Sequence, residues 1–346
     1  MKHKYYFLLM LLSLITLNCS KKDSNPVDNN QNPTNNSNVW TVYNTSNSPI
    51  YRNQVDVVVA DNSNNLWLGF STGLCKYDGS NWTKYDNTNS VLLNSSVGAI
   101  YSISDAVWIG IDSKWDGTKY INGGMAKYQG GNLSYYKFQQ NIGTNPAYVT
   151  AICSDANNIL YVGTSEGLVI INSNNWKILN KSNSSIPFES INSLKIDNSN
   201  NLWVGTWGGG LLKYNLTNQT WTQYNSTNSA IGTDRAEVIF IEQNIVWVCK
   251  DDGTGITKFD GSSWTPYTTS NGLPSNYVTS VLKNSNEYWF ATGDGGIAKS
   301  SNGQWTIYNI LNSATPSNKI IDFCLFQSSY LALATDDAGI VLFKIK

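Results

Sequence analysis

The sequence predicts an all-β fold, a single seven-bladed β-propeller built from four-stranded antiparallel blades. Two short patterns support this prediction, because each occurs seven times at a spacing of about 41 to 51 residues, a period typical of propeller blades. The composition agrees with it. Aromatic residues, which favour strands, make up 12% of the chain, and Asn-rich stretches, which favour turns, separate the patterns.

The first pattern is a strand, a glycine turn and a second strand, as in NLWVGTWGGGLLKY from Asn201 to Tyr214. The second is a strand of the form WTQY, and it begins at Trp40, Trp82, Leu133, Trp176, Trp221, Trp264 and Trp305. A phosphate-binding glycine loop would be followed by the N-terminus of a helix. Another strand follows here, so we interpret the glycines as turn residues with positive φ.

Each repeat unit is predicted to contain four strands. In the sixth unit we expect them at Tyr277–Leu282, Tyr288–Thr292, Gly296–Ser300 and Gln304–Tyr308. The large apolar side chains of the second and fourth strands would then form the core between neighbouring blades. Burial of each such side chain is worth roughly 1.5–3 kcal/mol.

The two ends of the repeat region should meet in one blade. The last unit supplies three strands, Lys319–Phe326, Tyr330–Thr335 and Gly339–Ile345, whereas Val39–Asn44 is an isolated strand of the fourth type. We expect this N-terminal strand to close the last blade and to leave no open sheet edge there. The predicted propeller therefore covers residues 39–346.

Residues 1–18 have the features of a signal peptide, with Lys2 and Lys4 before an apolar run too short to span a bilayer. The cysteine that follows, Cys19, resembles the lipidated residue of bacterial lipoproteins. We expect cleavage before Cys19, a membrane anchor on it, and a disordered tether over residues 19–38. These features predict a location in the cell envelope, at the outer membrane, facing either the periplasm or the outside. Ordinary signal cleavage beside a chance cysteine is the alternative.

The charged residues exclude several classes of function. The only histidine is His3, within the signal, so histidine-based triads, dyads and metal sites are not expected. The formal net charge of −1 predicts no nucleic-acid partner. We expect a monomer.

The stretch LWVGTWGGGLLKY followed by WTQY resembles the two-component regulator propeller repeat, and the resemblance extends over residues 39–346. It implies a propeller like those in the extracytoplasmic sensor portions of hybrid histidine kinases, many of which sense glycan fragments. The sequence shows no kinase or receiver region, so we do not expect this chain itself to signal by phosphotransfer.

Residues that depart from the repeat are candidates for function. Eleven of the thirteen tryptophans occupy repeat positions; Trp115 and Trp207 do not, and Trp115 lies in an insertion, Ile111–Gly124. Strand direction places both on one face with the two arginines. Because an exposed indole with polar neighbours suits a sugar ring, we predict a ligand patch there. Its members are Trp115, Tyr120, Glu166, Trp207, Arg235 and Asp251, with Arg52 on the same face. Alternatively, Trp115 packs onto the insertion and Trp207 covers the channel mouth.

No cofactor is expected. Aspartates in blades five to seven could bind Ca²⁺ through their oxygens, although aspartate beside glycine more often forms a turn. The predicted function is a lipid-anchored module that binds a glycan or an envelope protein. A pure protein scaffold and a propeller-type polysaccharide lyase or hydrolase are the alternatives.

Overall fold

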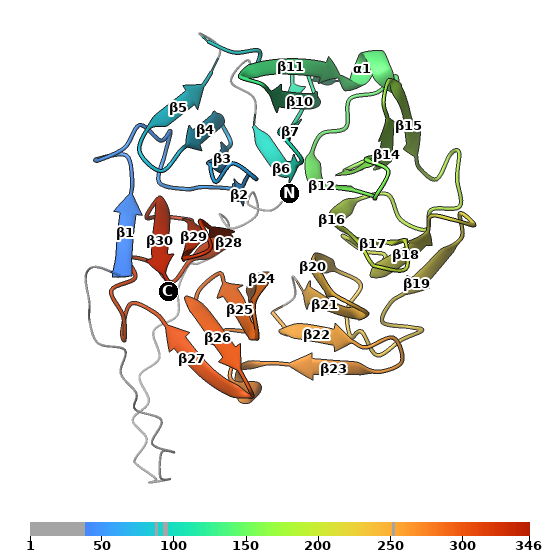
Figure 1. The fold of residues 1–346 in the computed structure, drawn as a ribbon. Helices are drawn as coiled ribbons and strands as arrows, with labels where there is room; N and C mark the ends of the chain where they lie inside the picture. Colours follow the sequence, from blue (N-terminus) through green and yellow to red (C-terminus); the bar gives the residue numbers. More distant parts are fainter. Residues whose placement is uncertain (1–38, 87–88, 93–95, 251–252) are drawn as a thin grey trace, which may run out of the picture. The chain divides into compact units, whose positions relative to one another are not determined.

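The computed structural model describes residues 39–86, 89–92, 96–250 and 253–346. These residues form seven four-stranded antiparallel sheets arranged as the blades of a ring, together with one two-stranded sheet (Figure 1). The predicted all-β, seven-bladed propeller is therefore confirmed. The predicted signal peptide, tether and lipidated Cys19 lie outside the described residues.

The innermost strand of each blade comes first in the sequence in blades 1 to 6, and the outermost comes last (Figure 1). Blade 1 contains β2 (Val57–Ala60), β3 (Leu66–Phe70), β4 (Gly73–Tyr77) and β5 (Trp82–Tyr85). Blade 2 contains β6 (Val97–Ile103), β7 (Ala106–Ile111), β10 (Gly124–Gln129) and β11 (Asn132–Lys137). Blade 3 contains β12 (Val149–Ser154), β13 (Leu160–Thr164), β14 (Gly167–Asn172) and β15 (Asn175–Leu179).

Blade 4 contains β16 (Ile191–Ile196), β17 (Asn201–Thr206), β18 (Leu211–Asn215) and β19 (Trp221–Tyr224). Blade 5 contains β20 (Ala236–Glu242), β21 (Ile245–Lys250), β22 (Ile256–Phe259) and β23 (Trp264–Tyr267). Blade 6 contains β24 (Val278–Asn284), β25 (Glu287–Thr292), β26 (Ile297–Ser301) and β27 (Gln304–Tyr308). The strands of the sixth blade begin and end within two residues of the predicted positions. Two short helical turns, α1 (Phe138–Asn141) and the 3₁₀ turn η2 (Thr269–Asn271), lie between blades.

Blade 7 joins the two ends of the described chain, as predicted. It contains β28 (Ile320–Phe326), β29 (Tyr330–Thr335) and β30 (Ile340–Lys344), and β1 (Trp40–Tyr43) pairs with β30 as the outermost strand. Trp40 lies opposite Phe343, and their rings stack with centroids 4.1 Å apart. The N-terminal strand thus completes the blade and covers its edge.

The hydrophobic core lies between adjacent blades rather than within them. Between blades 4 and 5, Trp203 and Leu211 pack against Ile239 and Val248. A comparable cluster joins each other neighbouring pair, including blades 7 and 1. Trp203 is only 3% exposed, which confirms that this tryptophan has a packing role.

Aspartate turns hold two of the buried tryptophans. Asp197, between β16 and β17, accepts a 2.8 Å hydrogen bond from Nε1 of Trp203, and Asp61 accepts one of 2.7 Å from Trp67 in blade 1. Blades 5 and 6 lack this aspartate, and Nε1 of both Trp247 and Trp289 is buried without a hydrogen-bond partner among the described residues. An unpaired buried N–H is unfavourable, so Trp247 and Trp289 stabilise the fold less than Trp67 and Trp203 do.

The Asn- and Ser-rich stretches form the connections between blades. After β1, the amide of Asn44 accepts hydrogen bonds from the N–H and hydroxyl of Ser46, and Asn47 bonds back to the main chain of Asn44 and Val42. The same arrangement recurs at Asn180 and Asn225. Side chains that bond to nearby backbone explain why these residue types fill the connections.

Candidate functional site

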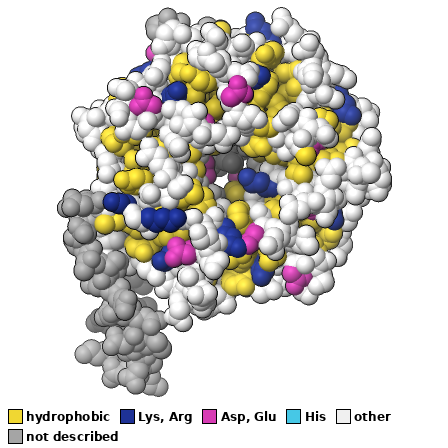
Figure 2. Space-filling view, viewed as in Figure 1, with side chains coloured by type: hydrophobic (Ala, Val, Ile, Leu, Met, Phe, Trp, Pro, Cys, Tyr) yellow, Lys and Arg dark blue, Asp and Glu magenta, His cyan; other side chains and the backbone are white. Residues whose placement is uncertain are grey.

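The antiparallel order of each blade divides the ring into two faces. The loop face carries the connections between blades and the loops between the second and third strands of each blade; the turn face carries the remaining turns. Figure 2 shows a central opening, with a few charged side chains near its edge and a surface that is otherwise mostly uncharged. The residues that depart from the repeat all belong to segments of the loop face.

The insertion in blade 2 forms a small β-hairpin that the sequence did not predict, with β8 (Lys114–Trp115) paired to β9 (Tyr120–Ile121). Asp116 shapes its tip by accepting hydrogen bonds from the N–H groups of Thr118 and Lys119. Trp115 is 54% exposed and Tyr120 is 37% exposed, and their rings meet edge to face at 5.1 Å. The two rings therefore contact each other on the hairpin and are both partly exposed to solvent.

Trp207 and Arg235 form the second group. Trp207 lies in the loop after β17 and Arg235 just before β20, so the pair bridges blades 4 and 5. The guanidinium carbon of Arg235 is 4.5 Å from the centre of the Trp207 ring, and Arg235 is exposed whereas Trp207 is half-buried. Stacking on the indole orients the guanidinium plane.

The glycines after Trp207 fix its loop. The Thr206 hydroxyl donates a 2.8 Å hydrogen bond to the carbonyl of Gly210 and accepts one from the N–H of Gly209. Gly210 has a φ of 75°, and a Cβ atom there would lie 2.2 Å from the carbonyl oxygen of Tyr224. These glycines are turn residues, and β18 follows them directly.

Three further predicted residues belong to the loop face without joining these pairs. Glu166, in the loop of blade 3, accepts a 2.8 Å hydrogen bond from the Thr144 hydroxyl. Arg52, before blade 1, donates to the Ser71 hydroxyl at 2.8 Å and to the amide of Gln54. Asp251 lies outside the described residues. The structure thus assembles two aromatic groups on separate blades, with Glu166 on the blade between them.

Sequence reasoning missed a ring of residues at the inner edge of the loop face. In blades 2 to 7 the innermost strand has a β-bulge near its start, and the corresponding position in blade 1 is Asp56. The bulged residues are Gly98, Thr150, Asn192, Glu237, Thr279 and Ile321. Bulges redirect side chains and are frequent at functional rims. Aligning the innermost strands of all seven units would have revealed this set of positions, five of which are polar.

The bulged side chains connect neighbouring blades. The Thr150 hydroxyl donates to the carbonyl of Ile191 at 2.6 Å, and the Asn192 amide donates to the carboxylate of Glu237 at 2.8 Å. Each bond runs from one blade to the next. The inner edge of the loop face is therefore held by side chains as well as by the cores between blades.

Asp56 is a member of this ring with a raised pKa. Burial raises the pKa of its carboxyl from 3.8 to about 6, and the Arg52 guanidinium and the N–H of Ser71 oppose that rise. The carboxylate of Asp336 adds a smaller upward contribution. Asp56 is therefore a proton-binding group near neutral pH at the channel mouth.

Lys250 is a second residue that sequence reasoning missed. It ends β21 at a position where blades 3, 4, 6 and 7 have Thr164, Thr206, Thr292 and Thr335, and it is only 5% exposed. Ala236, the partner of Lys250 in the sheet, directly follows Arg235. Two cationic residues therefore lie close together at the loop-face end of blade 5.

The predicted aspartates of blades 6 and 7 are not gathered around one point. Asp336 and Asp337 both face the ammonium group of Lys319, at 3.8 and 3.5 Å. Within the described ranges, no group of three or more His, Cys, Asp or Glu residues has the arrangement of a metal site. Over the same part of the chain, every helix is too short or too polar to cross a membrane.

Comparison with known proteins supports the resemblance seen in the sequence. Residues 185–208, which include β16, β17 and Trp207, match the family model described as two component regulator propeller. In the comparison with curated proteins, no sequence matches this chain. The chain thus contains a two-component regulator propeller repeat on a seven-bladed fold.

Solved structures share the fold at low sequence identity. Two are extracellular domains of hybrid two component system candidates from B. thetaiotaomicron, BT3049 (18% identity, TM-score 0.71) and BT4673 (16%, 0.68). Each alignment covers 88% of this chain but only 41% or 39% of the neighbour, so this chain spans about two fifths of either length.

A third neighbour is an enzyme of similar size. Virginiamycin B lyase from Staphylococcus aureus is 13% identical with a TM-score of 0.65, and the alignment covers 89% of this chain and 99% of the lyase. That structure holds quinupristin and is described as catalytically inactive after replacement of a histidine by alanine. At these identities the likeness shows the fold alone.

Proposed function

We propose that this propeller is a ligand-binding module of the bacterial cell envelope and that its loop face binds a glycan. The main support is the aromatic hairpin of Trp115 and Tyr120, because the Trp115 indole is 54% exposed even though it contacts the Tyr120 ring. The stacked pair of Trp207 and Arg235 adds a second aromatic group two blades away. The extracellular location of the two sensor domains with the same fold is consistent with an envelope protein.

The chemistry of the loop face suits a saccharide. Indole and phenol rings stack on the apolar face of a pyranose, while guanidinium, carboxylate and amide groups bond to its hydroxyls. Arg235 and Glu166 supply such groups on blades 4/5 and 3, between and beside the aromatic residues. An extended oligosaccharide lying across blades 2 to 5 would contact both aromatic groups.

The N-terminal sequence supports a membrane-anchored form. We propose that Cys19 is lipidated and that residues 19–38 connect the anchor to β1. Mass spectrometry of the membrane fraction should detect a diacylglyceryl adduct on Cys19, and Cys19→Ala should release the protein from membranes. A mature N-terminus at any other residue would contradict this anchor.

Catalysis is the second candidate function, because two lyases share the fold. The loss of activity on histidine replacement in one of them argues against the same chemistry here, since the only histidine of this chain is His3. Incubation of the purified protein with polysaccharides and with streptogramin B would decide the point. Release of unsaturated or ring-opened products would favour an enzyme.

A glycan array tests the binding function. The full chain should retain at least one glycan, and Trp115→Ala and Trp207→Ala should each weaken it about ten-fold or more, as removal of a stacking ring does. Tyr136→Ala is the matched control, because Tyr136 is 36% exposed on the outermost strand of blade 2. Retention of one stoichiometric envelope protein, with no glycan bound, would instead indicate a scaffold.

A further inference from the structure

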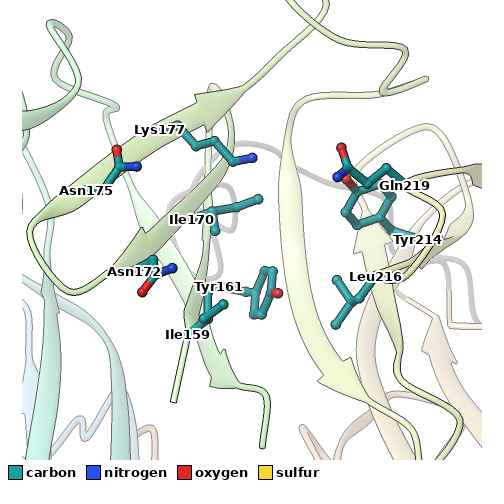
Figure 3. A pocket seen from close by; sticks show the side chains of 9 residues that line it. All are labelled: Ile159, Tyr161, Ile170, Asn172, Asn175, Lys177, Tyr214, Leu216 and Gln219. Carbon is teal, nitrogen blue, oxygen red and sulfur yellow. The ribbon is translucent and has the colours of Figure 1, made fainter. Parts of the chain in front are cut away.

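The turn face, opposite the proposed glycan surface, carries a pocket between blades 3 and 4 (Figure 3). Its volume is about 200 Å³, which is below the range of about 300–1,000 Å³ for drug-sized ligands and suits a single sugar-sized molecule. Ile159, Ile170 and Leu216 supply apolar surface to it. It shares no residue with the loop face, so any ligand here is a second one.

The pocket contains a tyrosine hydroxyl for which the described residues supply no hydrogen-bond partner. Tyr214 is only 5% exposed and lines the pocket, and its hydroxyl has no hydrogen-bond partner among the described residues. Burial raises the pKa of this hydroxyl, so it remains a neutral donor at physiological pH. A hydroxyl at a pocket wall without a protein partner is left to bond to a ligand or to water.

The repeat shows why this hydroxyl is free. The equivalent residue in blade 1, Tyr77, donates to the carbonyl of Gly79 at 2.8 Å and shares a 2.9 Å bond with the hydroxyl of Tyr43 from the preceding blade. In blade 3 the position of Tyr43 is taken by Leu179, which packs beside Tyr214 without a hydroxyl. The strand-to-strand turn after Tyr214 is also two residues longer than the one after Tyr77. Both internal partners have therefore been lost.

The remaining polar groups around the pocket are a second phenol, three amides and one ammonium group. Tyr161, on the blade 3 side, donates a long hydrogen bond of 3.5 Å to the carboxylate of Asp155, so its hydroxyl oxygen can still accept one. Three amides, those of Asn172, Asn175 and Gln219, lie at the outer edge. Lys177 extends over the pocket from blade 3 towards blade 4, and no carboxylate is among the lining residues (Figure 3).

These groups define the chemistry of the occupant. Two phenol hydroxyls and three amides, which both donate and accept hydrogen bonds, favour a ligand that carries several hydroxyls. The ammonium group without a lining carboxylate favours a negative charge on that ligand. The apolar lining favours C–H groups rather than a fully polar anion such as phosphate. We propose that this pocket binds one hexuronic acid unit, with Lys177 pairing with its carboxylate and Tyr214 donating to an oxygen of the sugar.

Titration of the full chain by calorimetry and saturation-transfer NMR tests the proposal. The probes are D-galacturonate and D-glucuronate, with D-galactose and D-glucose as neutral matches. Both uronates, or one of them, should bind at least ten-fold more tightly than the neutral sugar of the same configuration, and Lys177→Gln should remove that preference. Equal binding of the charged and neutral sugars, or binding of neither, would overturn it.

Two tyrosine variants separate a binding role from a structural one. Tyr214→Phe should weaken uronate binding about five-fold or more without lowering the melting temperature, because its hydroxyl makes no internal bond. Tyr77→Phe should lower the melting temperature and leave binding unchanged, since it loses two internal bonds. Equal effects of the two variants on binding would contradict the assignment of the pocket.

A loop-face variant makes the two proposals independent. Trp207→Ala should not change uronate affinity, since Trp207 belongs to the opposite face. Loss of uronate binding in Trp207→Ala, with Tyr214→Phe unaffected, would transfer the uronate site to the loop face and overturn the pocket proposal. Failure of uronates to bind at all would leave the glycan-array result on the loop face unaffected.

Discussion

Replacement of Asp56 by asparagine should change how the stability of the ring depends on pH. Burial raises the pKa of this carboxyl from 3.8 to about 6. Between these values the folded protein holds a proton that the unfolded chain has released, so the free energy of unfolding falls as the pH rises. About two pKa units at 1.36 kcal/mol each make the ionised carboxylate destabilising by about 3 kcal/mol above pH 6.

Asp56→Asn cannot ionise but can still accept the N–H of Ser71, so it should avoid this loss. The difference in free energy of unfolding between the variant and wild type should therefore change with pH. From below pH 4 to pH 8 it should shift by about 3 kcal/mol in favour of the variant. Urea unfolding followed by tryptophan fluorescence between pH 3.5 and 8 measures both proteins.

Asp78→Asn provides a control of opposite sign. Hydrogen bonds from the N–H groups of Asn81 and Ser80 lower the pKa of the exposed Asp78 carboxyl. The ionised Asp78 carboxylate therefore stabilises the folded protein above its ordinary pKa, and this stabilisation is lost as the pH falls. A constant difference between wild type and Asp56→Asn across the whole pH range would refute the argument for a buried, proton-holding carboxyl.

Three further experiments test the packing of the ring. Trp203→Phe should destabilise the protein by about 2 kcal/mol more than Trp289→Phe in urea unfolding, because only the indole N–H of Trp203 has a partner to lose. Trp40→Ala should cost about 3 kcal/mol and speed hydrogen exchange in β30, since it removes the ring stacked on Phe343; unchanged exchange would argue against closure by β1. Cys75 should not react with Ellman's reagent at pH 8 in the folded protein, since burial raises the pKa of its thiol to about 12, and rapid labelling would contradict its burial.

The blades could be predicted from the sequence because the information for each is local. Alternation of apolar residues and the glycine turns repeats seven times, so even the closing role of Val39–Asn44 follows from counting strands. The contacts of the candidate site are different in kind. The stacking of Arg235 on Trp207 joins residues 28 positions apart in neighbouring blades, and no local pattern encodes it.

Two other features needed three-dimensional comparison between repeats. The free hydroxyl of Tyr214 depends on the identity of Leu179 in the preceding blade, so Tyr214 looks like any other repeat tyrosine in the sequence. The raised pKa of Asp56 depends on burial, which composition does not report. The hairpin of β8 and β9 was missed because two-residue strands carry too little alternation to detect.

The pairing of β1 with β30 also constrains how the chain can reach its native state. The two strands are almost 300 residues apart in sequence, as Tyr43 and Ile340 are partners. Such a separation adds little to the entropy of loop closure, about 0.6 kcal/mol per doubling of length, yet contacts this distant form late. Until β1 and β30 pair, a newly synthesised chain exposes the unpaired backbone of both strands. A molecule that ended before blade 7 would keep β1 without its partner β30, and self-association through that strand, rather than a smaller stable ring, is its expected fate.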